Sequence, residues 1–258
     1  VWTSKGDGEY TIETKKRPEG CGTSITLHLK DADKEEEMPQ DFTDEWTLKS
    51  IIKKYSDFIE YPVRMLTEKQ EAEKDKDGKE IEGKTKTVVE DTVLNSQKAL
   101  WTRAPRDIKE EEYKEFYKHI TSDWTDPLDT IHYKAEGTQE FSALMYIPGM
   151  VPFDYNQRDM KYGLSLYVKR VFIMDHCAKL VPQYLRFVKG LVDSSDLPLN
   201  VSRELLQQDR RIEAIQKALV SKILRTLQTK LDKKREDYEK VWEKFGQTIK
   251  EGIASDHS

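Results

Sequence analysis

Cysteine is scarce in this sequence, which contains only Cys21 and Cys177 among its 258 residues. Two thiols cannot form the disulfide framework of a small secreted domain, and neither has ligand partners at the spacing of a zinc site, although His176 precedes Cys177. The sequence therefore predicts reduced thiols, a cytoplasmic location and no metal site.

Long apolar runs and an excess of basic residues are also missing. No stretch approaches the roughly 18 apolar residues of a membrane-spanning helix, and no signal-peptide pattern opens the chain. Lys and Arg total 43 against 48 Asp and Glu, a net charge of -5, whereas nucleic-acid-binding modules usually carry a positive stripe. We therefore expect neither a membrane nor a nucleic acid as partner.

No self-contained catalytic motif is present: the sequence has no Walker loop, no GxGxxG after a strand, no GxSxG and no HExxH. The length suffices for one large or two modest domains, and 10% aromatic residues argue against disorder despite 35% charged residues. The chain opens on Val1 and closes just after a helical pattern, so we interpret it as a piece of a longer protein.

The first 30 residues have the pattern of strands. A hairpin signal lies at Gly6-Asp7-Gly8, and Ile25, Leu27 and Leu29 alternate with polar residues as in a half-buried strand. Residues 31–41 form a charged connector that contains Pro39, which makes them the predicted boundary.

Helical periodicity replaces alternation after this boundary. Apolar residues spaced three and four apart predict an amphipathic helix over 42–60, followed by a strand at 61–66. The charged stretch around 67–87 has two interpretations, a disordered linker or an exposed hairpin with its turn at Asp77-Gly78. We favour the hairpin, because apolar pairs flank the stretch and both signs of charge are mixed within it.

The remainder predicts strands followed by helices. A helix is expected over 107–121, with Asp107 as its cap. The other expected elements are strands at 130–136, 139–147, 163–174 and 187–192, and helices at 202–227 and 231–250. Together these predict an α/β fold of mixed α+β type, in which a layered αβα domain over 42–200 is followed by a helical segment over 201–258.

The segment 193–211 contains the most specific candidate for chemistry. Arg203 falls in or just before the first turn of the following helix, and Gln207 leaves the same face four residues later. An arginine there opposes the helix dipole, and a bound phosphate would relieve that conflict. The alternative is a structural ion pair of Arg203 with a neighbouring carboxylate. Candidate partners are Glu204, Asp196 and Asp193.

The run DSSDLPLNVSRELLQQ at 193–208 resembles the middle domain of the heat-shock protein 90 chaperones, and similar patterns follow the family's order along most of the chain. They are LKSIIKKYSDFIEYPV (48–63), KALWTRAPRDIKEEEYKEFYKHI (98–120), DWTDPL (123–128), EGTQEFSALMYIP (136–148), PFD (152–154), LYVKRVFIMD (166–175) and YLRFVKGLVDSSDLPLNVSRE (184–204). The short charged segment resembles the bacterial, high-temperature protein G type. Residues 1–30 resemble the last strands of the family's N-terminal ATP-binding domain.

This resemblance implies a chaperone driven by ATP with Mg²⁺, whose nucleotide pocket lies in the N-terminal domain, so that this chain alone is expected to be inactive. The implied partners are partly unfolded client proteins, the N-terminal ATP-binding domain, and a second copy joined through a C-terminal domain. Arg203 matches the family's arginine that reaches the γ-phosphate, and Gln207 matches the glutamine of the same docking surface.

Further positions match residues that the family uses for client contact or for relaying conformational change. Trp101 and Phe172 match such residues, although either could equally be an ordinary core residue. The loop around Phe153–Lys161, with Phe153 and Tyr155, matches an amphipathic client-contact loop, and its polar surroundings predict an exposed ring for Phe153. Two other functions stay open: an ATP-independent interaction scaffold with a structural Arg203, and an independent α/β enzyme with a carboxylate site.

Overall fold

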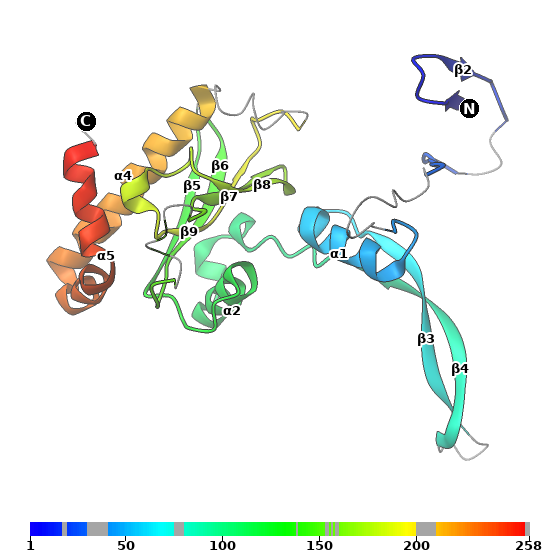
Figure 1. Cartoon of the computed structure of the whole chain (residues 1–258), viewed down its shortest axis with the longest axis horizontal. Helices are drawn as coiled ribbons and strands as arrows, with labels where there is room; N and C mark the ends of the chain where they lie inside the picture. The colour runs from blue at the N-terminus through cyan, green and yellow to red at the C-terminus, as the bar shows by residue number, and fades with distance from the viewer. Residues whose placement is uncertain are drawn as a thin grey trace. The chain divides into compact units, whose positions relative to one another are not determined.

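The computed structural model contains a mixed β-sheet with helices on both faces (Figure 1). The structure describes residues 1–16, 20–29, 41–74, 80–137, 139–152, 155, 157, 160–199 and 210–255. The chain divides into two compact units, Val1–Asp41 and Phe42–Ser258. The first unit contains an antiparallel pair, β1 (Trp2–Ser4) and β2 (Tyr10–Ile12).

Within the described part of the second unit, five strands form one sheet in the order β5-β6-β9-β7-β8. All neighbours are antiparallel except β7 and β9, which are parallel. The strands are β5 (Asp129–Ala135), β6 (Phe141–Ile147), β7 (Leu164–Val168), β8 (Val171–Cys177) and β9 (Lys189–Ser194). Because β9 lies between two strands on one side and two on the other, its direction is fixed by hydrogen bonds along both edges.

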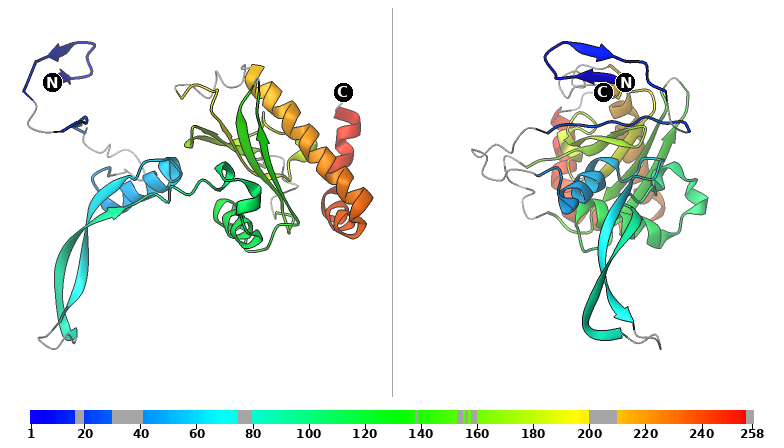
Figure 2. Two further views of the ribbon diagram at one scale, coloured as in Figure 1. Left: turned by 180° about the vertical axis from the view of Figure 1, so that it is seen from behind. Right: turned by 90° about the vertical axis from the view of Figure 1, so that its right-hand side faces the viewer.

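Apolar residues on the two faces of this sheet build two separate cores. In β6, Ala143 and Met145 join the core under α4 (Arg210–Lys233) and α5 (Arg235–Ser255), whereas Leu144 and Tyr146 join the core on the other face. That second core contains residues of α2 (Glu110–Thr121) and of η1 (Leu100–Thr102). Figure 2 shows α4 crossing one face of the sheet. The predicted layered α/β fold, with its helical segment, is confirmed.

The helix starts follow ordinary capping chemistry, with one correction. The Oδ2 of Asp44 accepts a hydrogen bond from the Thr47 amide at 2.7 Å, just before α1 (Glu45–Ser56). The prediction of Asp107 as the cap of α2 is wrong, because Asp107 ends the 3₁₀ turn η2 (Pro105–Asp107). Instead the Lys109 amide donates to Glu112 Oε2 at 3.0 Å, which satisfies a donor that the helix leaves free.

An antiparallel hairpin occupies the charged stretch, formed by β3 (Arg64–Lys74) and β4 (Glu80–Val93). The residues 75–79 that connect them, and with them the predicted turn at Asp77-Gly78, lie outside the described residues. At its base Asn95 Oδ1 accepts from the Val63 amide at 2.8 Å, and Asn95 Nδ2 donates to the Tyr61 carbonyl at 3.0 Å. At the base of the hairpin the Asn95 side chain therefore satisfies backbone groups of residues 61 and 63.

Two strand predictions are corrected by the structure. Residues 163–174 are two strands rather than one, because the chain turns back at Lys169 and Arg170. Residues 22–29 have no regular secondary structure, and Ile25 and Leu27 are more than three-quarters exposed. Alternation favours a strand only where a neighbouring strand accepts its backbone hydrogen bonds, and none is paired with 22–29 in the described part of the chain.

None of the helices in the described ranges is both long enough and apolar enough to cross a membrane. The connector 31–40 and the first residues of the predicted 202–227 helix lie outside the described residues, and regular helix begins in the structure again at Arg210.

Asp57, directly after α1, joins three elements through one buried carboxylate. Its Oδ1 accepts from the Ser96 amide at 2.8 Å and pairs with Lys53 at 3.0 Å, and its Oδ2 faces His119 of α2 at 3.7 Å. Burial alone would raise the pKa of Asp57, but these partners outweigh it and lower the pKa to about 2. The ionised carboxylate therefore stabilises the junction.

Asp57→Asn should lower the free energy of unfolding by about 2 kcal/mol at neutral pH, the worth of such a pKa shift. A carboxyl with a lowered pKa stabilises the fold above its ordinary pKa and loses this effect as the pH falls. The difference between wild type and variant should therefore shrink from pH 5 to pH 3 in urea unfolding. Asp91→Asn, which breaks an exposed pair with Arg64, should cost less than about 1 kcal/mol. A difference that does not change with pH would contradict the assignment.

Gly190 in β9 provides a test of the sheet itself. Its φ is +128°, and a Cβ there would lie 2.1 Å from the Leu144 carbonyl oxygen of β6. Gly190→Ala should cost more than about 3 kcal/mol in unfolding free energy. Gly137 has nearly the same φ, +125°, but open space around it, so Gly137→Ala should cost about 1 kcal/mol from backbone strain alone. Equal losses would show that contact with β6 is unimportant.

Candidate functional site

The predicted site residues divide between the described and the undescribed parts of the chain. Arg203, Gln207 and Phe153 lie outside the described residues, so their roles stay predictions. The described residues on either side of 200–209 contact each other, since Arg211 Nη1 donates to the Asp196 carbonyl at 2.9 Å. Leu197 and Ile212 are both buried in the core under α4. These contacts tie the end of β9 to the start of α4.

Trp101 lies entirely within the core, with no exposed surface. Its ring centroid is 4.9 Å from that of Phe58 and 5.4 Å from that of Tyr167. The indole Nε1 donates to Asp193 Oδ2 at 2.8 Å, and the Trp101 carbonyl lies 3.0 Å from His132 Nε2. This placement favours the packing interpretation of Trp101, since a side chain without exposed surface offers no direct contact to another protein.

The tautomer of His132 follows from its two neighbours. A carbonyl can only accept, so Nε2 carries the proton toward Trp101, and Nδ1 accepts from the Tyr113 hydroxyl at 2.7 Å. Burial lowers the pKa of His132, which favours this neutral form. The backbone carbonyl of Trp101 is thus bound by His132 of β5, which Tyr113 of α2 supports. The indole is bound by Asp193 of β9.

Asp193 is the residue that joins Trp101 to the turn between β7 and β8. While Oδ2 accepts from the indole, Oδ1 accepts from the Arg170 amide at 3.1 Å. Lys169 and Arg170 have φ of 50° and 65°, and the Lys169 amide donates to the Ser194 carbonyl at 3.2 Å. Two left-handed non-glycine residues cost free energy, so this turn depends on the partners that the end of β9 supplies.

Two of the three carboxylates suggested as structural partners of Arg203 already have other contacts, and the third, Glu204, lies outside the described residues. Asp193 binds Trp101 and Arg170, and Asp196 Oδ2 accepts from the Glu140 amide at 2.7 Å. Asp193 is only 9% exposed and forms no ion pair with any residue that the structure describes. Sequence reasoning considered Asp193 only as a partner of Arg203, because nothing in the local pattern indicates contacts with the distant Trp101.

Phe172 lies one residue beyond Val171, the first residue after this turn, and is partly buried on the α1 side of the sheet. Its ring centroid is 5.7 Å from that of Tyr55 in α1 and 5.5 Å from that of Tyr167. Both contacts have edge-to-face geometry, which aromatic pairs favour. Phe172 therefore links α1 to the turn that Asp193 supports.

Tyr155, named as a candidate client contact, is buried in the structure. It is 5% exposed, its hydroxyl donates to Thr248 Oγ1 of α5 at 2.7 Å, and its ring packs against Phe245. The Arg186 guanidinium lies 5.1 Å from the ring centroid and forms two hydrogen bonds to Glu251, at 2.5 and 3.0 Å. A polar loop sequence gave no signal that α5 would cover this ring.

A cavity of about 870 Å³ borders the turn at one end of the sheet. Cations line it at Lys134, Lys169 and Arg170, and carboxylates line it at Glu136 and Glu140. Because both signs are present, this cavity does not by itself select an anionic ligand. The described residues contain no group of three His, Cys, Asp or Glu side chains that could hold a metal ion.

The link between Trp101 and Asp193 can be measured directly. Asp193→Asn leaves one acceptor oxygen for two donors, the Trp101 indole and the Arg170 amide, and Trp101→Phe removes the indole donor. Each variant should lose about 1–3 kcal/mol, because each leaves a buried polar group without its partner. The double variant should lose clearly less than the sum, with a coupling energy of about 1 kcal/mol or more. Additive losses in urea unfolding would mean that the two groups do not interact.

Comparison with known proteins places this framework in a family. The chain matches the model described as "Hsp90 protein" over residues 41–87 and 67–258. "Chaperone protein HtpG" of Bdellovibrio bacteriovorus is 56% identical over 256 residues, which is 99% of this chain and 38% of that protein. The HtpG proteins of Geobacter metallireducens and Mycobacterium tuberculosis are 52% and 50% identical over 259 and 256 residues, covering 100% and 99% of this chain and 39% of each relative. The chain thus spans less than two-fifths of these relatives, and it belongs to the Hsp90 protein family.

Proposed function

We propose that this chain is the part of an ATP-dependent molecular chaperone that supplies Arg203 to the γ-phosphate of ATP held by another domain. The observation that carries the proposal is the 50–56% identity to proteins named "Chaperone protein HtpG" over nearly the whole chain. ATP with Mg²⁺ would be bound by the N-terminal ATP-binding domain, so that the present chain contributes the guanidinium and Gln207 but holds no nucleotide at this site alone.

The chemistry of phosphoryl transfer explains why an arginine would be lent in this way. Charge spreads over the oxygens of the transferred group, and a forked guanidinium neutralises it at fixed geometry. Arginine fingers of this kind are worth about 10³–10⁵ in rate. We expect a smaller effect here, because closure of the domains is expected to limit turnover. An arginine from a second domain makes hydrolysis conditional on docking.

The contacts around the arginine segment support this proposal. β9 leads into the segment from the middle of the sheet, and Asp193 fixes the end of β9 to the buried Trp101. On the far side, Arg211 ties the start of α4 back to Asp196. Sites on rigid elements keep catalytic geometry better than sites on free loops. In this proposal Trp101 and Phe172 act through packing, by transmitting movement of β9 or α1 to the Lys169–Arg170 turn.

Client binding is the second part of the proposed function. Phe153 stays the candidate contact of the loop that Tyr155 anchors to α5. Outside this loop, large aromatic side chains are exposed at Trp124 (93%), Trp46 (76%) and Tyr61 (76%). Exposed aromatic rings suit weak capture of partly unfolded chains. Trp101 and Tyr155 would take part only after a local rearrangement.

In the full-length chaperone, Arg203→Ala should lower the ATP turnover number by about tenfold or more while leaving the affinity of the N-terminal domain for ATP unchanged. Arg203→Lys should restore little, because an ammonium cannot reproduce the fork. Arg106→Ala is the matched control, since Arg106 is exposed and its recorded ion pair is with the neighbouring Asp107.

A coupled ATPase assay with a melting curve for each variant distinguishes the alternatives. Normal turnover in Arg203→Ala would remove Arg203 from the mechanism. A lower melting temperature with unchanged turnover per folded molecule would instead favour the interaction scaffold with a structural arginine. The present chain alone should hydrolyse no ATP above background, and mixing it with the separately made N-terminal domain tests whether it completes the site.

A further inference from the structure

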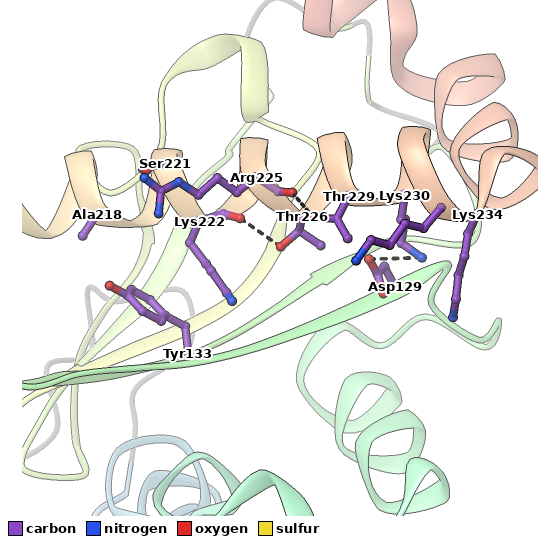
Figure 3. Close-up of a pocket in the computed structure, with 11 residues that line it drawn as sticks. Asp129, Tyr133, Ala218, Ser221, Lys222, Arg225, Thr226, Thr229, Lys230 and Lys234 are labelled. Carbon is purple, nitrogen blue, oxygen red and sulfur yellow. Dashed lines mark hydrogen bonds and ion pairs between the residues drawn. The ribbon is translucent and has the colours of Figure 1, made fainter.

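A basic groove runs between α4 and β5, on the face of the sheet opposite Trp101 (Figure 3). Its volume is about 620 Å³, within the range of about 300–1,000 Å³ that is usual for small-molecule sites. Its charged lining residues are Lys222, Arg225, Lys230, Lys233, Lys234 and Asp129. The groove therefore contains five cationic side chains and a single carboxylate.

The one carboxylate is already engaged. Asp129 Oδ2 pairs with Lys230 Nζ at 3.2 Å, and both side chains are less than one-fifth exposed. The other four cations form no ion pair with any residue in the described ranges. Four positive charges in the groove therefore have no carboxylate partner among the residues that the structure describes.

This concentration of charge is specific to α4 rather than general to the chain. The chain carries a net charge of -5, whereas Glu213 and Asp232 are the only acidic residues of α4. Lys222 and Arg225 are three residues apart, and Lys230 is three and four residues from Lys233 and Lys234. Like charges at these spacings destabilise a helix by a few tenths of a kcal/mol per pair. Lys230 and Lys233 lie in the last turn of α4, where the helix dipole favours cations. Lys222 and Arg225 lie farther from that end, and their repulsion points to an external anion.

The groove also presents its cations in defined positions. The Lys222 ammonium lies 5.7 Å from the centroid of the Tyr133 ring of β5, a cation–π contact. Figure 3 shows Lys222 extending from α4 toward β5 above Tyr133. The hydroxyls of Thr226 and Thr229 donate to the carbonyls of Lys222 and Arg225, at 2.9 and 2.8 Å. These two hydroxyls are therefore engaged within the helix, and the charged donors of the groove are its cationic side chains.

We propose that this groove binds an oligophosphate group. Several uncompensated cations in one small cavity require a ligand that concentrates several negative charges. A phosphate group supplies about -1.5 to -2 charges and three acceptor oxygens, whereas a carboxylate supplies one charge. The Arg225 fork and the neighbouring ammonium groups match phosphate oxygens. The shared chemistry is that of a free oligophosphate or of the phosphate tail of a nucleotide, and the site is separate from the proposed role of Arg203.

Isothermal titration of the present chain with inorganic tripolyphosphate tests this proposal. We expect saturable 1:1 binding that weakens by more than about tenfold between 50 and 200 mM salt, as expected for charge neutralisation. Orthophosphate should bind more weakly than tripolyphosphate. ATP without Mg²⁺ forms a second arm: tighter binding than tripolyphosphate identifies a nucleotide, which could stack on Tyr133, and equal or weaker binding identifies the free oligophosphate.

The variant Lys222→Gln/Arg225→Gln should weaken tripolyphosphate binding about tenfold or more, because two of the uncompensated cations are lost. The control Lys98→Gln/Lys244→Gln removes the same charge from exposed positions outside the groove and should change binding less than about twofold. Far-ultraviolet circular dichroism checks that both variants fold. The proposal is overturned by absence of saturable binding, by equal weakening in the two variants, or by citrate binding as tightly as tripolyphosphate.

Discussion

The carboxylate of Asp193 is the contact on which the arrangement around the candidate site depends. It accepts one hydrogen bond from the buried indole of Trp101 and another from the amide of Arg170. Without it, a buried donor would lose its partner at a cost of about 1–3 kcal/mol, and a turn with two left-handed residues would lose its support. This turn determines where β8 begins, and the start of β8 places Phe172 in contact with Tyr55 of α1.

These contacts connect packing to the proposed chemistry through chain order. Asp193 is the penultimate residue of β9, the central strand of the sheet, and Arg203 follows ten positions later in the sequence. A strand with hydrogen-bonded neighbours on both edges cannot shift without breaking two ladders, so the point from which the arginine segment departs is fixed. The same carboxylate binds the indole of Trp101, and His132 binds the backbone carbonyl of that residue. Packing changes near Trp101 are therefore expected to reach the end of β9.

Much of the fold was predictable from the sequence, because periodicity survives where an element has one clear environment. The amphipathic stripe of α1 and the strands β5 and β6 were found at nearly their observed positions. The turn at Lys169 and Arg170 was missed, because left-handed turns are usually marked by glycine or asparagine, and here distant residues of β9 support it. The burial of Tyr155 likewise has no local signal, because it depends on α5, some ninety residues later in the sequence, which covers the ring. Arg203 and Gln207 rest on the family resemblance, and the described contacts concern only their surroundings.

The charge on α4 is tolerated because another effect is larger. Five apolar residues, Ile212, Ile215, Leu219, Ile223 and Leu227, are buried along one side of the helix. Burial of such a side chain contributes about 1.5–3 kcal/mol, whereas each like-charge pair on the other side costs about 0.2–0.5 kcal/mol. The apolar stripe therefore determines that the helix forms and where it lies on the sheet, with a wide margin over the repulsion. Of the cations facing β5, Lys230 pairs with Asp129 and Lys222 contacts the Tyr133 ring, so these two also contribute to packing. Arg225, Lys233 and Lys234 have no such contact among the described residues, and the concentration of charge in one groove is better explained by a bound anion than by helix stability.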